Sequence, residues 1–192
     1  MSSETAAAAA LAEHLELAAR AAELLPRAGE VARRLIETYE RGGRLYTFGN
    51  GGSSLDAQHV TEELVGRFQR ERRPLPAQSL AADAAALTCI ANDYSFEDVF
   101  ERQVRAFVRP EDLVIAFSTS GRSPNVVRGL AAAREAGATT VLFGGGDGGP
   151  ARAYADLALL IPSRSTARIQ ELHVFLLHVV IDEVDAWAAD RS

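Results

Sequence analysis

A histidine and a glutamate stand four residues apart in a segment with helical character. His59 and Glu63 lie in the predicted helix 54–68, so their side chains share one face. A histidine and a carboxylate at this spacing can bind one zinc ion, and they can equally form a surface ion pair. The pair is therefore a candidate for metal binding or acid–base chemistry, with a plain ion pair as the alternative.

A second set of candidate side chains lies in the long helix predicted for residues 167–189. Its amino-terminal half carries four polar residues, Gln170, Glu171, His173 and His178, so two of the 4 histidines of the chain are there. His178 lies in the apolar run 174–180. A histidine in such a run is either a hydrogen-bonded core residue or a functional group whose pKa near neutrality suits proton transfer.

A turn rich in hydroxyl groups precedes another predicted helix. It reads Ser118-Thr119-Ser120-Gly121-Arg122-Ser123, and Pro124 follows it. Ser123 is a good N-cap and Pro124 a good first helical residue, so the unpaired amides of the helix and its positive dipole end would face the turn. A polar loop that merely caps a helix is the alternative. The clustering of hydroxyls favours a phosphate site instead.

Two glycine-rich turns are weaker signals. Gly49-Asn50-Gly51-Gly52-Ser53 lets the backbone approach a ligand closely, but its spacing is not that of the dinucleotide fingerprint. Taken alone, it is no better evidence for a ligand site than for a tight turn. The second run, 144–149, is predicted to be a flexible surface loop.

The framework that must position these residues alternates short strands with longer helices. Strands are predicted at 44–48, 76–80, 112–117, 139–143 and 156–161, and helices at 4–25, 26–41, 54–68, 84–91, 96–108, 124–137 and 167–189. This order predicts an α/β fold with a parallel sheet covered by helices on both faces. Ligands of such sheets bind beyond the carboxyl ends of the strands, here the turns after Phe48, Phe117 and Phe143.

Composition excludes several function classes. All 20 basic residues are arginine, so lysine Schiff-base chemistry and a P-loop lysine are both absent, and phosphate must be held by amides, hydroxyls or arginine. The net charge of −6 argues against a nucleic-acid partner. No apolar run approaches the ~20 residues of a membrane span, and no secretory signal is recognised, so we expect a cytoplasmic protein. The single cysteine, Cys89, is predicted to be a core residue.

The sequence resembles the SIS (sugar isomerase) domain family, and specifically its phosphoheptose isomerases. The resemblance spans nearly the whole chain and is carried by Gly49-Asn50-Gly51-Gly52-Ser53, residues 56–67, Asn92-Asp93, Ser118-Thr119-Ser120-Gly121 with Ser123, and Arg168-Ile169-Gln170-Glu171 with His173 and His178. It implies one SIS domain over 1–192 with a five-stranded, doubly wound, flavodoxin-like sheet. It also implies a homotetramer with active sites shared between subunits, in which we expect the helical segment 1–42 to pack.

The resemblance implies a reaction and a site. The reaction would interconvert D-sedoheptulose 7-phosphate and D-glycero-D-manno-heptose 7-phosphate through a cis-enediol, with Glu63 as base and His178 as acid/base. Zinc would be bound by His59, Glu63, Gln170 and His178. Substrate would be contacted by Asn50, Gly51, Gly52, Ser53, Glu63, Asn92, Asp93, Ser118, Thr119, Ser120, Ser123 and Gln170.

The spacing of two of these ligands bears on the shared site. If Gln170 and His178 lie in one helix, they are about 12 Å apart along its axis, too far for one zinc ion to bind both easily. Either Gln170 precedes the helix, or the two groups reach one site from different subunits. Two positions depart from the family as it occurs in lipopolysaccharide synthesis, Ala167 in place of an acidic residue and Ser54 in place of a common histidine.

Two non-enzymatic alternatives share the resemblance. Residues 164–171 are also similar to the DnaA initiator-associating protein, a regulator with the same fold that lacks equivalents of Glu63 and His178. A SIS-type sugar-phosphate sensor is the third possibility, but such domains usually accompany a DNA-binding module. Because this chain carries both Glu63 and His178, an isomerase is favoured. An isomerase of a different sugar phosphate is a further alternative.

Overall fold

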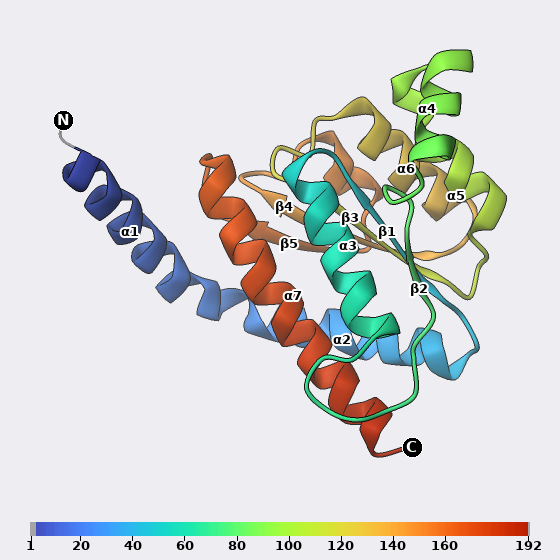
Figure 1. Cartoon of the computed structure of the whole chain (residues 1–192), viewed down its shortest axis with the longest axis horizontal. Helices are drawn as coiled ribbons and strands as arrows, with labels where there is room; N and C mark the ends of the chain where they lie inside the picture. The colour runs from blue at the N-terminus through green and yellow to red at the C-terminus, as the bar shows by residue number, and fades with distance from the viewer. Residues whose placement is uncertain (1–2, 192) are drawn as a thin grey trace.

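The computed structural model describes residues 3–191 and contains a five-stranded parallel sheet in the order β2-β1-β3-β4-β5 (Figure 1). The strands are β1 (Leu45–Gly49), β2 (Ala77–Ser79), β3 (Leu113–Ser118), β4 (Thr139–Gly145) and β5 (Leu157–Ile161). Every neighbouring pair is parallel. The predicted α/β fold with a five-stranded parallel sheet is thereby confirmed.

Helices cover both faces of the sheet. They are α1 (Ser3–Arg20), α2 (Leu25–Glu40), α3 (Gly52–Val65), α4 (Ala84–Asp93), α5 (Glu101–Phe107), α6 (Pro124–Glu135) and α7 (Thr166–Ala189). Alternate strand residues point to opposite faces, so the core is split in two. Leu113, Ile115 and Phe117 of β3 pack with α2, α3 and α7, whereas Val114 and Ala116 pack with α5 and α6.

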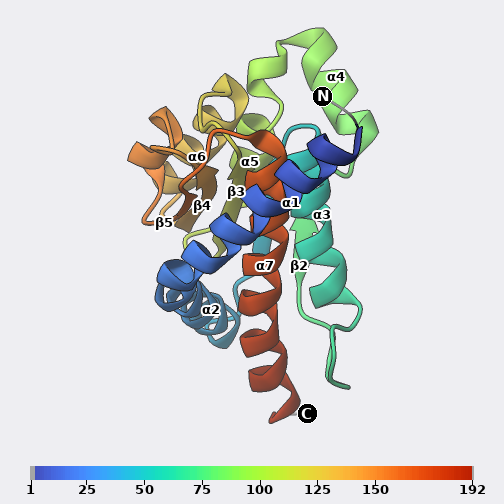
Figure 2. The same cartoon turned by 90° about the vertical axis from the view of Figure 1, so that its left-hand side faces the viewer.

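The two amino-terminal helices have different environments. Helix α2 is buried along the face that carries Val31 and Leu35. Helix α1 ends at Arg20, earlier than predicted, and a 3₁₀ turn at 21–24 joins it to α2. In Figure 1 the first turns of α1 diverge from the rest of the molecule, and in Figure 2 the helix crosses over α7. Its Leu11 and Leu15 side chains are 59% and 60% exposed, so an apolar stripe of α1 faces outward.

Two expectations for the middle of the chain are wrong. Cys89 is exposed rather than buried, because no side chain of Ala84–Asp93 is buried in the structure and α4 stands outside the helical layer (Figures 1 and 2). The predicted helix 96–108 is broken. Ser95 caps a 3₁₀ turn at 96–98 by accepting a hydrogen bond from the amide of Glu97, and α5 begins only at Glu101.

Candidate active site

A polar cavity lies beyond the carboxyl ends of β1 and β3. Its volume is about 230 Å³, and it is lined by Asn50, Gly52, Ser53, Phe117, Ser118, Thr119, Ser120, Ser123, Thr166 and Gln170. The expectation that ligand-binding turns follow Phe48 and Phe117 therefore agrees with a real cavity. Thr166, the first residue of α7, is a lining residue that sequence reasoning missed. Its place at the start of a helix next to a predicted site was the available signal.

The hydroxyl-rich turn after β3 is shaped by its own side chains. Ser118 Oγ accepts a hydrogen bond from the Gly121 amide at 3.1 Å, and Ser120 Oγ accepts one from the Arg122 amide at 3.2 Å. Ser123 occupies the N-cap position of α6 as predicted, but within residues 3–191 its side chain makes no capping hydrogen bond. Ser123 lines the cavity, so its hydroxyl and the amides of the helix are available to an anion there.

The glycine run after β4 does not form a free surface loop. Strand β4 extends through Gly145, and Gly148 and Gly149 lie directly against Gly121 of the hydroxyl-rich turn. A Cβ atom on Gly121 would lie 1.9 Å from the Gly148 carbonyl oxygen, and the φ angle of Gly121 is +61°. The run therefore forms the wall that fixes the shape of the turn.

The first glycine-rich turn is tied to both neighbouring helices. The side-chain amides of Asn50 and Asn125 each donate a hydrogen bond of 2.9 Å to the other, and these two bonds join this turn to α6. Gly51 has a φ angle of +55°, in the left-handed region that favours glycine. A Cβ atom on Gly52 would lie 2.4 Å from the Gln170 side-chain nitrogen, so Gln170 lies directly over the start of α3 and a larger residue at position 52 would displace it.

Three of the predicted metal ligands meet at one point. His59 Nε2 lies 3.4 Å from Glu63 Oε1 and 3.3 Å from His178 Nε2, and the ligand atoms of all three lie within 4.8 Å of one another. Two ligands at ~2.1 Å from a tetrahedral zinc ion are about 3.4 Å apart, so this donor set fits zinc. The ring of Phe68 stacks on His178 with centroids 5.5 Å apart, a contact that the sequence did not predict.

The environment keeps His178 in the form that metals bind. Burial lowers the pKa of His178, and the neighbouring His59 lowers it further, while Glu63 raises it. The net shift is downward, so the imidazole is neutral at neutral pH. A neutral imidazole nitrogen can bind a metal or accept a proton.

The other predicted site residues are placed differently. Gln170 lies inside α7, which begins at Thr166, so the alternative in which Gln170 precedes the helix is wrong. Gln170 lines the cavity at the start of α3. Asn92 and Asp93 end the protruding α4, are exposed, and are not among the residues that line this cavity in one subunit. His173, by contrast, is a core residue whose Nε2 lies 3.1 Å from the Gly144 carbonyl oxygen.

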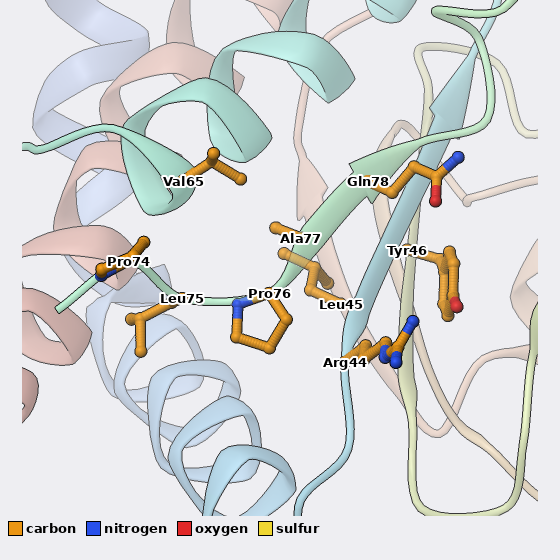
Figure 3. A pocket seen from close by; sticks show the side chains of 9 residues that line it. All are labelled: Arg44, Leu45, Tyr46, Val65, Pro74, Leu75, Pro76, Ala77 and Gln78. Atoms are coloured by element: carbon orange, nitrogen blue, oxygen red, sulfur yellow. The ribbon is translucent and has the colours of Figure 1, made fainter.

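A more apolar cavity of about 360 Å³ lies at the amino ends of strands β1 and β2 (Figure 3). It is bounded by Leu45 and Ala77, the first residues of β1 and β2, and by Val65 at the end of α3. Figure 3 shows Arg44 and Tyr46 as its titratable side chains, with no carboxylate or imidazole among the lining residues. This cavity therefore lacks the carboxylate and imidazole groups that the acid–base cluster of α3 and α7 provides.

Membrane insertion finds no support in the helices. Across residues 3–191, none of them combines the length and the apolar character that a membrane span requires.

Comparison with known proteins agrees with the fold and identifies the family. A family model described as SIS domain matches residues 7–145. The chain is 48% identical over 176 residues to the phosphoheptose isomerase of Trichlorobacter lovleyi, with 91% of this chain and 90% of that protein covered. The solved phosphoheptose isomerases of Neisseria gonorrhoeae and Francisella tularensis are 36% and 31% identical, with TM-scores of 0.91 and 0.93. They cover 96% and 97% of this chain, and all of both structures is matched.

The chain belongs to the SIS domain family. Within that family it groups with the phosphoheptose isomerases, and it is accordingly an enzyme, an aldose–ketose isomerase of sugar phosphates. The regulatory alternatives raised by residues 164–171 are therefore not favoured.

The contact between Gly121 and Gly148 predicts a selective loss of substrate binding. In Gly121→Ala the new methyl group would collide with the Gly148 carbonyl and displace the hydroxyl-rich turn. We expect KM for a sugar phosphate to rise about tenfold or more, since ~1.4 kcal/mol of lost binding is tenfold.

Gly42→Ala is the matched control, because Gly42 has a φ angle of +80° but nothing lies within 4 Å of the position that the new methyl group would take. Steady-state kinetics on both variants separates backbone strain from collision. Equal KM values in the two variants would contradict the role given to this contact.

Proposed function

We propose that this enzyme interconverts D-sedoheptulose 7-phosphate and D-glycero-D-manno-heptose 7-phosphate. The observation that carries the proposal is the meeting of His59, Glu63 and His178, which combines a carboxylate and two imidazoles in one half-buried cluster. The names of the relatives support the heptose phosphate, because each of the similar proteins cited above is called a phosphoheptose isomerase. The hydroxyl-rich turn supports the phosphate.

The reaction moves one proton between neighbouring carbons of the sugar. Glu63 takes the proton from the carbon next to the carbonyl and returns it to the other carbon through a cis-enediol. Because the pKa of His178 is lowered, its imidazole is neutral and can accept a proton from one oxygen. It then donates that proton to the other oxygen. No atom is gained or lost, so the pair needs no further reactant.

Zinc is the proposed cofactor. His59, Glu63 and His178 would hold it, with Gln170 as a further ligand. When bound, zinc polarises the carbonyl of the substrate and favours charge on its oxygen. Since Gln170 and His178 stand about 12 Å apart along α7, and His178 already meets His59 and Glu63 in one chain, we propose that Gln170 reaches the ion from a neighbouring subunit.

The phosphate end of the substrate would be held by the two turns. Ser118, Thr119, Ser120 and Ser123 line the cavity with hydroxyl-bearing side chains, and Asn50, Gly52 and Ser53 line it from the turn after β1. Binding energy from this remote group positions the reacting carbons at Glu63. Asn92 and Asp93 are proposed to contact substrate as well, from a neighbouring subunit.

A homotetramer would complete the site. The outward apolar stripe of α1 and the unburied helix α4 are the surfaces that support this assembly. Contiguous exposed apolar side chains usually mark protein–protein contacts. We place the enzyme in the cytoplasm, where sugar phosphates are metabolised.

Glu63→Gln should remove the base while keeping the shape of the side chain. We expect kcat to fall by about 10²–10⁴-fold, because general-base catalysis contributes that much. A proton-NMR assay with sedoheptulose 7-phosphate measures it. Glu62→Gln, the exposed neighbour on α3, is the control and should retain activity. Near-normal turnover by Glu63→Gln would refute the assignment.

Removal of metal should abolish conversion. After treatment with a chelator we expect no turnover, and zinc should restore it. His59→Asn should bind less zinc in a competition titration, because it loses one of three converging ligands. Conversion that is indifferent to the chelator would remove zinc from the essential mechanism and leave the isomerase assignment standing.

Charge on the stripe of α1 should disrupt the assembly. In the double variant Leu11→Asp, Leu15→Asp two carboxylates replace exposed leucines on one face. We expect a smaller particle by light scattering and lower activity. Ala9→Asp, on the face that already carries Glu13, should keep the wild-type mass. A double variant with unchanged mass would show that α1 is not an interface.

A further inference from the structure

The carbonyl groups that end α3 are satisfied by a single buried arginine and two backbone amides. Arg72 Nη2 donates to the carbonyl of Glu63 at 2.7 Å, and Arg72 Nη1 donates to that of Leu64 at 2.9 Å. The amides of Gly66 and Leu75 donate to Glu62 at 2.7 Å and to Leu64 at 3.0 Å. Helix ends leave such carbonyls without intrahelical partners, and a cation there also complements the helix dipole. Arg72 is therefore the side-chain cap of the helix that carries His59 and Glu63.

The charge of Arg72 is matched from α7. Arg72 Nε donates to Asp185 Oδ1 at 3.0 Å, and both side chains are wholly buried. Asp185 Oδ2 accepts hydrogen bonds from the amides of Arg70 at 2.9 Å and Gln69 at 3.3 Å. Burial raises the pKa of Asp185, but these hydrogen bonds and the arginine outweigh burial and leave the pKa below its usual range. The pair is thus charged, and every polar atom that it buries has a partner.

This pair joins the two helices that supply the reacting groups. Asp185 follows His178 by seven residues, which places the two side chains on one face of α7 about two turns apart. Arg72 binds the backbone of Glu63 itself. In Figure 1 the loop that contains Arg72 runs from the end of α3 back past the carboxyl-terminal half of α7. One guanidinium group therefore ties the backbone of the proposed base to the helix of the proposed acid.

We propose that Arg72 and Asp185 are positioning residues that set the distance between the Glu63 carboxylate and the His178 imidazole. The inference rests on the proposed function of these two groups. Arginine is required because its planar fork reaches Asp185 and several carbonyls at once, whereas the ammonium group of lysine is a compact point charge. A displacement of ~1 Å at a reacting group can cost 10²-fold in rate, so a loosened pair would act on turnover.

Arg72→Lys tests the proposal while keeping the charge. We expect kcat to fall at least tenfold with KM within about twofold, measured where circular dichroism shows a folded protein. Arg105→Lys is the matched control. Arg105 is an exposed arginine of α5 that bonds Glu101 and Glu135 and lies in the layer on the other face of the sheet. It should retain wild-type kcat.

A second readout needs neither substrate nor metal. The rings of His59 and His178 lie 4.9 Å apart, so their ring-proton NMR resonances report their relative position in the metal-free protein. We expect both resonances to shift in Arg72→Lys while that of His14, which pairs with Glu171, stays in place. If the wild-type enzyme does not convert sedoheptulose 7-phosphate, only the proposed function is refuted. The histidine resonances still test whether Arg72 and Asp185 position His59 and His178.

A variant that keeps the core closed guards against misfolding. The double variant Arg72→Met, Asp185→Leu removes both charges, and replacement of a buried ion pair by apolar groups often preserves stability. Because it also removes the partners of the Glu63 carbonyl and of the Gln69 and Arg70 amides, its fold is checked first by circular dichroism. We expect it to fold and to show the same loss of kcat. If either folded variant retains wild-type kcat and wild-type histidine resonances, Arg72 and Asp185 are structural only and the proposal is overturned.

Discussion

Helices α3 and α7 come from opposite halves of the chain, and both must bury an apolar face against the same side of the sheet. Ala57, Val60 and Leu64 of α3 and Leu172, Leu176 and Ile181 of α7 lie in one core cluster with β3 and β4. Burial of such apolar side chains is the dominant favourable contribution to the free energy of folding. It also leaves His59, Glu63 and His178 facing one another at the edge of that contact. The acid–base cluster is thus a by-product of how the core is closed.

Local sequence patterns were sufficient for most of the framework, and they offered His59, Glu63 and His178 only as candidates for the site. The continuous apolar runs at β3 and β4 predicted buried parallel strands, and the i, i+4 spacing of His59 and Glu63 predicted a shared helical face. That His178 meets them, 119 residues away from His59, could come only from the family resemblance. Periodicity contains no information on which helices become neighbours across a sheet.

The failures have physical causes of the same kind. Apolar composition predicted that Cys89 would be buried, but α4 packs only Leu87, Ile90 and Ala91 against the core, and Cys89 lies on the uncovered side of the helix. The stacking of Phe68 on His178 and the salt bridge of Arg72 with Asp185 depend on a loop that returns across α7. Such contacts join residues more than 100 positions apart, and no local rule selects one arginine among 20.

The reciprocal amide pair between Asn50 and Asn125 limits how this enzyme can drift in evolution. Each amide gives one donor and one acceptor to the other, so aspartate at either position would set two oxygens face to face. A small apolar residue at one position would leave the side-chain amide at the other, buried at Asn125 and half-buried at Asn50, without its partner, which costs ~1–3 kcal/mol. A change of both residues, made one at a time, therefore passes through a single mutant that is less stable. The two asparagines, 75 residues apart, are therefore expected to co-vary among relatives, so that both are kept or both are replaced.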